Sequence, residues 1–180
     1  QRLLGIALMS AAVGQFAFLD TTAKYLNTEL DSFQIAWARY TFAFLLTSLI
    51  SNPFTAPGLL STKRPLLQVA RSFLLVCATV GNFLALRWMQ LDEVLSIIFT
   101  FPFLVSIISG PMLGEWIGAR RWAAVGVGFC GVLLITRPGL GGAQPAALFS
   151  VIATVSYALY AVITRIVSRT DSNQTSLFYS

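Results

Sequence analysis

The chain has 180 residues, of which 56% are hydrophobic and only 11% are charged, and its mean hydropathy is +0.75. Soluble domains carry about 25% charged residues, so this composition excludes an ordinary water-soluble fold. The net charge of +5 does not indicate a nucleic-acid partner, because the basic residues stand at the ends of apolar runs and do not cluster on a soluble face.

Six long apolar runs follow one another from end to end of the chain. A helix that rises ~1.5 Å per residue needs about 20 apolar residues to cross a ~30 Å hydrocarbon core. Four runs meet that length, and the second and fifth reach it only with flanking residues or local thinning. Helices satisfy their own backbone hydrogen bonds in lipid, so we expect an all-α, polytopic membrane helix bundle. The runs are Leu3–Ala23, Phe33–Ile50, Leu66–Leu86, Val94–Leu113, Trp122–Thr136 and Ala146–Val167.

The lysine and arginine residues are divided unevenly between the alternate sides of this predicted bundle. One side collects eight of them, and the other collects Lys24, Arg87 and Arg137, plus Arg39 if it is counted. The positive-inside rule places the richer side, and with it the N-terminus, in the cytoplasm. The eight residues are Arg2, Lys63, Arg64, Arg71, Arg120, Arg121, Arg165 and Arg169.

Small residues recur at helical spacing in three of the runs. Lipid gives helices no hydrophobic drive to associate, so small side chains must let the backbones approach. These stripes predict close packing within the bundle, and a homodimer interface is the alternative. They consist of Ala7, Ala11, Gly14, Gly110, Gly114, Ala124, Gly128 and Gly131.

Pro102 stands in the middle of the fourth run, among the aromatic residues Phe99, Phe101 and Phe103. A proline inside a helix removes one backbone hydrogen bond and kinks the helix. Two interpretations stay open: a tolerated structural kink, or a hinge or unwound segment that faces a substrate cavity. In the second case the neighbouring aromatic side chains would line that cavity.

Two ionisable residues lie within predicted spans. Asp20 is about one turn from the outer end of the first run, and Arg39 is nearly two turns inside the second run from the same end. A charge in the bilayer costs several kcal/mol unless it is paired or hydrated. We therefore expect Asp20 and Arg39 to meet or to share a water-filled outer vestibule, with Lys24 as a competitor for Asp20. A structural ion pair and a substrate or proton site are equally compatible with this pattern.

Further polar and aromatic residues in the runs are candidates for ligand contacts. Gln15 and Asn82 each carry an amide that must find partners, either on another helix or on a ligand. Trp37 stands beside Arg39, whereas most of the tryptophans fit an interfacial aromatic belt. Tyr157 and Tyr160 follow in the sixth run. With Asp20, Arg39, Phe99 and Pro102, these residues form the predicted substrate-binding set.

The sequence predicts no metal site and no cofactor. It contains no histidine, and its two cysteines, Cys77 and Cys130, lie within apolar runs at no metal-ligand spacing. Without histidine the usual catalytic triads are also excluded. An enzyme is therefore not expected.

Several short motifs stand in a fixed order over Leu3–Gly139. They are Phe16-Ala17-Phe18-Leu19-Asp20, Trp37-Ala38-Arg39-Tyr40, Ala85-Leu86-Arg87-Trp88, Asp92-Glu93-Val94 through Gly114-Glu115, and Arg120-Arg121-Trp122 through Arg137-Pro138-Gly139. Their order and spacing resemble the EamA-domain proteins of the drug/metabolite transporter superfamily. The first two motifs are similar to a bacterial branch with S-adenosylmethionine-uptake-like members, which implies the inner (plasma) membrane.

The resemblance implies ten helices in two inverted five-helix repeats, with a substrate cavity between the halves. Residues 3–139 would be the first repeat, and residues 146–180 would be the start of the second, ending at the beginning of a seventh helix. The chain also opens without a methionine. We therefore expect a fragment of a longer transporter, trimmed at its N-terminus.

Three functional classes are open to a polytopic helix bundle of this kind. The first is a secondary transporter that moves a small polar or amphipathic metabolite by alternating access, either coupled to protons through Asp20 or working by exchange. The second is a non-transporting scaffold or receptor-like bundle, against which the ionisable pair argues. The third is an intramembrane enzyme, which would need a converging nucleophile and base that the sequence does not show.

Overall fold

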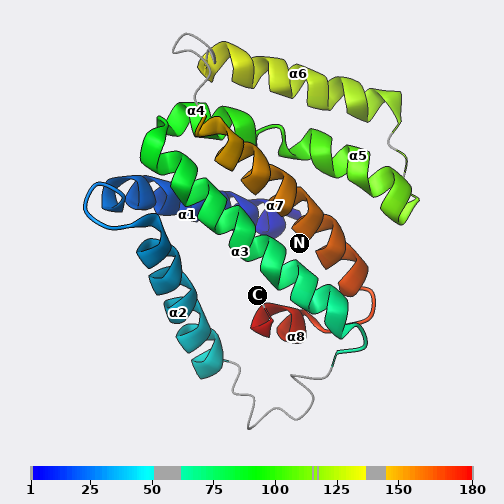
Figure 1. Ribbon diagram of the computed structural model, residues 1–180. Coiled ribbons are helices and arrows are strands. Elements are labelled where there is room, and N and C mark those ends of the chain that lie inside the picture. Colours follow the sequence, from blue (N-terminus) through cyan, green and yellow to red (C-terminus); the bar gives the residue numbers. More distant parts are fainter. Residues whose placement is uncertain (1, 51–61, 115, 117, 137–144, 180) are drawn as a thin grey trace.

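The computed structural model describes residues 2–50, 62–114, 116, 118–136 and 145–179. All regular structure within these residues is helical, and the helices surround a central pair (Figure 1). They are α1 (Arg2–Leu26), α2 (Ser32–Ile50), α3 (Pro65–Trp88), α4 (Leu91–Ile98), α5 (Phe101–Leu113), α6 (Ala119–Thr136), α7 (Ala147–Val167) and α8 (Asn173–Phe178).

The predicted apolar runs correspond to the observed helices, which confirms the all-α membrane bundle. Four segments are long and apolar enough to cross a membrane: Leu3–Leu26, Pro65–Trp88, Leu91–Leu113 and Ala147–Val167. They match the four runs that meet the full length by sequence. The chain is therefore a multi-pass membrane protein. Arg137 and the rest of the predicted motif at 137–139 lie outside the described residues.

The fourth run is divided into α4 and α5 at Phe99 and Thr100. Pro102 has no N–H to donate and occupies the first turn of α5, where that donor is not needed. At the junction the amides of Thr100 and Phe103 bond to carbonyls three residues back, and the Thr100 hydroxyl donates to the Ile97 carbonyl at 2.7 Å. The proline thus separates two helices, so this segment is a break and not a simple kink.

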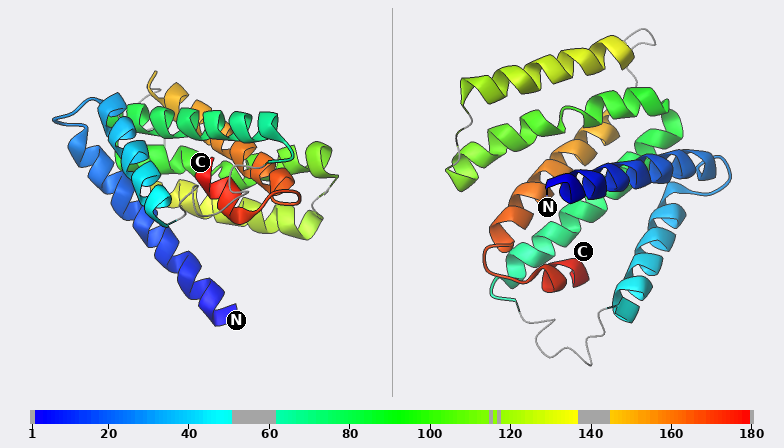
Figure 2. Two further views of the ribbon diagram at one scale, coloured as in Figure 1. Left: turned by 90° about the horizontal axis from the view of Figure 1, so that it is seen from below. Right: turned by 180° about the vertical axis from the view of Figure 1, so that it is seen from behind.

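The central pair is formed by α3 and α7, which cross side by side in both views of the bundle (Figures 1 and 2). Their backbones approach most closely at Gly81. A Cβ atom at this position would lie 3.0 Å from the Phe149 carbonyl oxygen and 3.1 Å from the Ala153 Cβ. Because only a glycine leaves room for that approach, the small residue acts here as expected for membrane helices.

Most glycines of the predicted stripes do not form such contacts. A Cβ added at Gly14, Gly128 or Gly131 meets nothing within 4 Å in the described part of the chain, whereas one at Gly110 would lie 3.2 Å from the Trp116 ring. The N-terminal half of α1 also projects beyond the other helices, as Figure 2 shows. The prediction of close packing is therefore wrong for Gly14, Gly128 and Gly131, and the close contact between helices uses Gly81, which is in no predicted stripe.

One end of the bundle is held by the corner between α1 and α2. Lys24 donates to the carbonyls of Leu86 and Met89 at 2.5 and 2.6 Å. Asn27 donates to the Phe83 carbonyl at 3.2 Å and accepts from the Ser32 hydroxyl at 2.7 Å. The last carbonyls of a helix have no partner within it, so Lys24 completes the end of α3, while Asn27 adds a bond to a carbonyl one turn earlier.

This arrangement corrects the expectation that Lys24 competes for Asp20. Lys24 caps α3 and does not compete for Asp20. Helices α1 and α2 also diverge from their corner, and each packs against α3 more than along the other (Figure 1). The buried apolar core lies at the same end of the bundle, and consists of Ala23, Ile35, Ala36, Phe83, Ala85, Leu86, Met89, Val94 and Ala146.

A carboxylate outside the membrane-spanning helices lies at each end of the bundle. Asp31 accepts from the backbone N–H of Phe33 at 2.9 Å and pairs with Arg87 at 2.8 Å, and these contacts lower the pKa of its carboxyl. At the other end, the Thr62 hydroxyl and then the Gln68 amide lower the pKa of Asp171. Asp171 thereby joins the start of α3 to the segment between α7 and α8.

Arg71 lies inside α3, although it was counted among the loop charges by sequence. Its side chain is 2% exposed and donates to the Ser176 carbonyl of α8. Its guanidinium carbon also lies 5.5 Å from the centre of the Tyr160 ring. Because a buried cation needs such partners, Arg71 helps to hold α8 against α3 and α7.

The contact at Gly81 yields a test of the central pair. We expect Gly81→Val to lower the stability of the intact protein by about 1–3 kcal/mol, because the added methyl groups would overpack the crossing. The matched change Gly128→Ala meets open space and should be neutral or stabilising by up to ~1 kcal/mol, since alanine favours helix. Thermal unfolding in detergent measures both, and equal shifts would contradict the close crossing.

The Lys24 contacts yield a second test. We expect Lys24→Met to cost about 1.5–3 kcal/mol of stability, because two carbonyls at the end of α3 lose a charged donor. If Lys24 caps α3 and does not neutralise Asp20, its effect should add to that of Asp20→Asn within about 0.5 kcal/mol. A strong coupling between the two changes in a double-mutant cycle would instead show that they interact directly.

Candidate functional site

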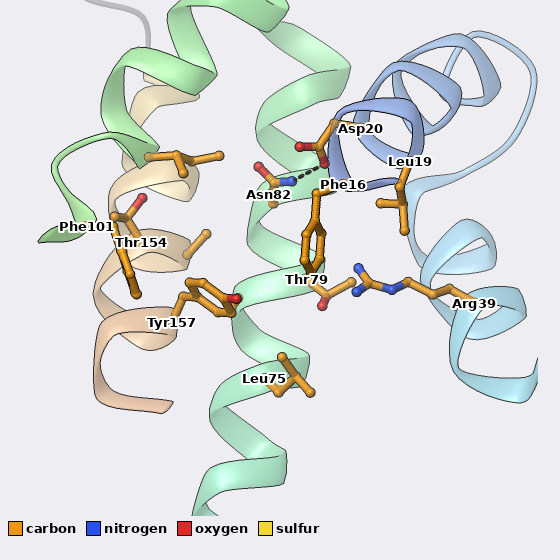
Figure 3. Close-up of a pocket in the computed structure, with 13 residues that line it drawn as sticks. Phe16, Leu19, Asp20, Arg39, Leu75, Thr79, Asn82, Phe101, Thr154 and Tyr157 are labelled. Atoms are coloured by element: carbon orange, nitrogen blue, oxygen red, sulfur yellow. Dashed lines mark hydrogen bonds between the residues drawn. The ribbon is translucent and has the colours of Figure 1, made fainter. Parts of the chain in front are cut away.

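A cavity of about 240 Å³ lies between the central pair and the helices around it (Figure 3). α1, α2, α3, α4, α5 and α7 all contribute to its walls. Asp20, Arg39 and Asn82 each lie about two turns, or ~10 Å, from the helix ends that meet at the α1–α2 corner. The lining residues are Phe16, Leu19, Asp20, Arg39, Leu75, Ala78, Thr79, Asn82, Ile98, Phe101, Ala153, Thr154 and Tyr157.

The acidic group of the cavity is held by an amide from the neighbouring helix. Asn82 Nδ2 donates to Asp20 Oδ1 at 3.2 Å, and Figure 3 shows the two side chains directed toward each other. The remaining amide oxygen, Asn82 Oδ1, is buried and has no hydrogen-bond partner in the described structure. This pair therefore places a carboxylate with unused acceptor capacity in the cavity wall, and Asn82 holds it there.

The basic group enters the cavity from α2. The Arg39 side chain extends toward Thr79 and Phe16 (Figure 3), and its guanidinium carbon lies 5.9 Å from the Tyr40 ring centre and 6.0 Å from that of Phe83. Tyr40 itself is fixed on α3, because its hydroxyl lies 3.0 Å from the Leu75 carbonyl oxygen and 2.8 Å from the Thr79 hydroxyl. Ring faces attract a guanidinium but leave its N–H donors available.

Asp20 and Arg39 share this cavity without forming an ion pair. Within the described residues, Arg87 and Asp31 form a salt bridge at the surface, and Asp20 and Arg39 do not form one. The expectation of a direct Asp20–Arg39 contact is therefore wrong, whereas both groups do line one cavity. The physical reason is the divergence of α1 and α2, which opens a space between two side chains of similar depth.

Aromatic side chains form the opposite wall. The Phe101 and Tyr157 rings lie 5.1 Å apart between their centres, and Tyr157 stacks on Tyr160 at 5.6 Å with an interplanar angle of 14°. Tyr160 does not line the cavity but continues toward Arg71. The wall on the α5–α7 side is thus mainly aromatic, with Thr154 beside the rings, and it faces the charged groups from α1 and α2.

The nine predicted site residues are divided by the structure. Asp20, Arg39, Asn82 and Tyr157 line the cavity, and Tyr160 stacks behind it. Gln15 and Trp37 point outward, and Trp37 is 72% exposed. Phe99 and Pro102 line a separate hollow against α6, together with Ala124, Val125, Gly128 and Phe129.

Phe101 takes the place that sequence analysis gave to Phe99. Side chains that are two positions apart along a helical segment point to nearly opposite sides. Phe99 therefore faces α6, and Phe101 faces α7. Thr79 and Leu75 were also missed. They lie three and seven residues before Asn82, a spacing that places all three on one helix face, so this spacing was a usable signal.

Together these observations define a membrane bundle whose helices enclose a small cavity with both signs of charge. The chain belongs to the EamA-like transporter family, whose pattern it matches over residues 3–137. This family consists of transporters and not enzymes. No solved structure gives a significant match.

Curated relatives carry transporter names. The chain is 29% identical over 164 residues to an S-adenosylmethionine uptake transporter of Rickettsia prowazekii, covering 89% of this chain and 54% of the relative. It is 28% identical over 167 residues to a riboflavin transporter of Rhizobium johnstonii, with 90% and 54% covered. A riboflavin transporter of Vibrio cholerae is 27% identical over 180 residues, with 98% and 60% covered. The chain spans about half the length of these relatives.

Water access to the cavity can be tested with thiol labelling. After replacement of Cys77 and Cys130, we expect Thr79→Cys to react with a membrane-impermeant reagent at least about tenfold faster than Phe73→Cys on the outer face of α3, because the reactive thiolate forms only in water. Labelling of intact protein in membrane vesicles measures the ratio. Equal rates at the two positions would mean that the cavity is closed to water.

Proposed function

We propose that the protein is a secondary transporter that moves a small polar or amphipathic metabolite across the membrane, and that this chain forms its first half. Residues 3–139 constitute the first five-helix repeat, and residues 146–180 begin the second. Rocking of one repeat against the other would expose the cavity to each side in turn. The N-terminus would lie in the cytoplasm, as the distribution of basic residues favours, and the protein would lie in the inner membrane, as its resemblance to a bacterial branch of the family implies.

One observation carries this proposal: two opposite charges line a cavity inside a bundle that must cross lipid. Ionisable groups in membrane segments are costly and mark substrate or ion pathways. A scaffold would gain stability by replacing them with apolar side chains or by pairing them directly. The cavity therefore supports recognition of a solute, and Asp20 is the candidate for proton coupling as the acidic side chain in its lining.

The names of the relatives support the class of solute. S-adenosylmethionine and riboflavin both combine polar groups with a flat ring system, and the cavity combines charged groups with the Phe101 and Tyr157 rings. Stacking on aromatic rings and charge-assisted hydrogen bonds are the contacts that such solutes can use. Binding residues for this role are Asp20, Arg39, Asn82 and Tyr157.

Uptake by the full-length protein in proteoliposomes tests the proposal. We expect at least one solute from a metabolite mixture to accumulate above protein-free vesicles, as measured by mass spectrometry. Asp20→Asn should reduce that accumulation by about tenfold or more, because a charged hydrogen bond is worth about 1.5–3 kcal/mol.

The matched control is Asp31→Asn, which removes an exposed carboxylate outside the cavity and should leave uptake near wild type. If no solute from the mixture accumulates in either direction of loading, the transport function is wrong, and a scaffold role would take its place.

A further inference from the structure

The cavity contains three polar groups whose bonding capacity is not used within the described chain. The Asp20 carboxylate accepts one hydrogen bond within the described residues, from Asn82 Nδ2 at 3.2 Å, although a carboxylate can accept about four. Asn82 Oδ1 is buried without a partner. Arg39 makes no hydrogen bond and no ion pair among the described residues, and its guanidinium carbon lies 5.9 and 6.0 Å from the ring centres of Tyr40 and Phe83.

The unused hydrogen-bond acceptors and the unused donors lie at different ends of the cavity. The acceptors of Asp20 and Asn82 lie together where α1 meets α3, whereas the donors of Arg39 come from α2 on the other side of Phe16 (Figure 3). Burying an ionised group without a partner costs far more than exposing it to water. Each end of the cavity therefore offers a gain in free energy to a ligand group of the opposite charge.

The space between the two ends is mainly apolar, although two threonine side chains also belong to the lining. Leu19, Leu75, Phe101 and Tyr157 line it, and the volume of about 240 Å³ lies below the ~300–1,000 Å³ of sites for drug-sized ligands. A ligand of matching shape is small, with an apolar or aromatic body and charged groups at its two ends.

We propose that the cavity selects a zwitterion, with a cationic group on Asp20, which Asn82 holds in place, and an anionic group on Arg39. This inference rests on the proposed transport function and names the class of its solute. A ligand with only a cationic group would leave Arg39 unpaired and would be repelled by it. A ligand with only an anionic group would leave Asp20 unpaired and would be repelled by that carboxylate. Only a solute that carries both charges satisfies both ends at once.

The first test is the charge class of the solutes that the full-length protein accumulates in proteoliposomes. We expect the accumulated solute to be a zwitterion and to be preferred at least about tenfold over its N-acetyl derivative, which lacks the cation, and its carboxamide, which lacks the anion. Accumulation of neutral or singly charged solutes alone would overturn the zwitterion but not the transporter. No accumulation at all would overturn the transport function itself.

The second test assigns each charge to its residue. Asp20→Asn should raise the uptake ratio of the N-acetyl derivative to the zwitterion by about tenfold, and Arg39→Gln should raise that of the carboxamide to the zwitterion by a similar factor. Each ratio is measured within one variant, so it does not depend on the amount of folded protein. Asp31→Asn and Arg87→Gln, which remove the two charges of the exposed ion pair, are the matched controls and should leave both ratios unchanged.

A double variant separates recognition from simple charge balance. If Asp20 and Arg39 only neutralise each other through the cavity, Asp20→Asn combined with Arg39→Gln should recover wild-type uptake of the zwitterion, and the inference is then wrong. If both contact the solute, the double variant should lose the zwitterion by more than either single change and favour the neutral N-acetyl carboxamide.

Discussion

The close crossing of α3 and α7 at Gly81 is the contact on which the rest of the bundle depends. In lipid, apolar side chains gain nothing by leaving the solvent, so association relies on packing at short range. The approach of Gly81 to the Phe149 carbonyl and Ala153 supplies that packing. Ala78, Asn82 and Thr154 flank the crossing and line the cavity, so the same contact that joins the two helices also fixes one wall of the site.

The other walls follow from how the remaining helices reach this pair. α1 and α2 are joined to α3 at their corner and diverge from it, while α4 and α5 change direction at Phe99 and Thr100. Divergence keeps Asp20 and Arg39 in one space without direct contact. In a low-dielectric interior such a separation costs free energy, and proteins keep costs of this kind where a binding site requires them.

Much of the fold could be predicted from the sequence, because the length and apolarity of a run determine whether it spans a bilayer as a helix. An acidic residue near the start of a helix is a further signal of this kind: Glu93 in the first turn of α4 accepts a hydrogen bond from the amide of Gln90 at 3.1 Å. The site was readable only where a polar residue is costly in lipid, as for Asp20, Arg39 and Asn82.

Sequence reasoning failed where the direction of a side chain decides its role. Phe99 and Phe101 have the same chemistry and differ only in the face of the helix that they occupy, which depends on the break at Thr100. Gly81 could not be distinguished from Gly128, since composition does not reveal which glycine meets a neighbour. Sequence spacing places Lys24 within reach of Asp20. The structure instead joins Lys24 to the unpaired carbonyls at the end of α3, which spacing along the chain does not reveal.

The ties between the α1–α2 corner and α3 have an evolutionary consequence. Lys24, Asn27 and Ser32 bond to main-chain oxygens of residues 83, 86 and 89, and every amino acid presents such an oxygen. Replacing one apolar side chain of this segment by another therefore leaves these bonds in place, and only packing limits the exchange, because Phe83, Leu86 and Met89 belong to the buried core. Sequence drift among family members should therefore spare the three donors, while the segment that they hold should vary only among apolar side chains of similar volume.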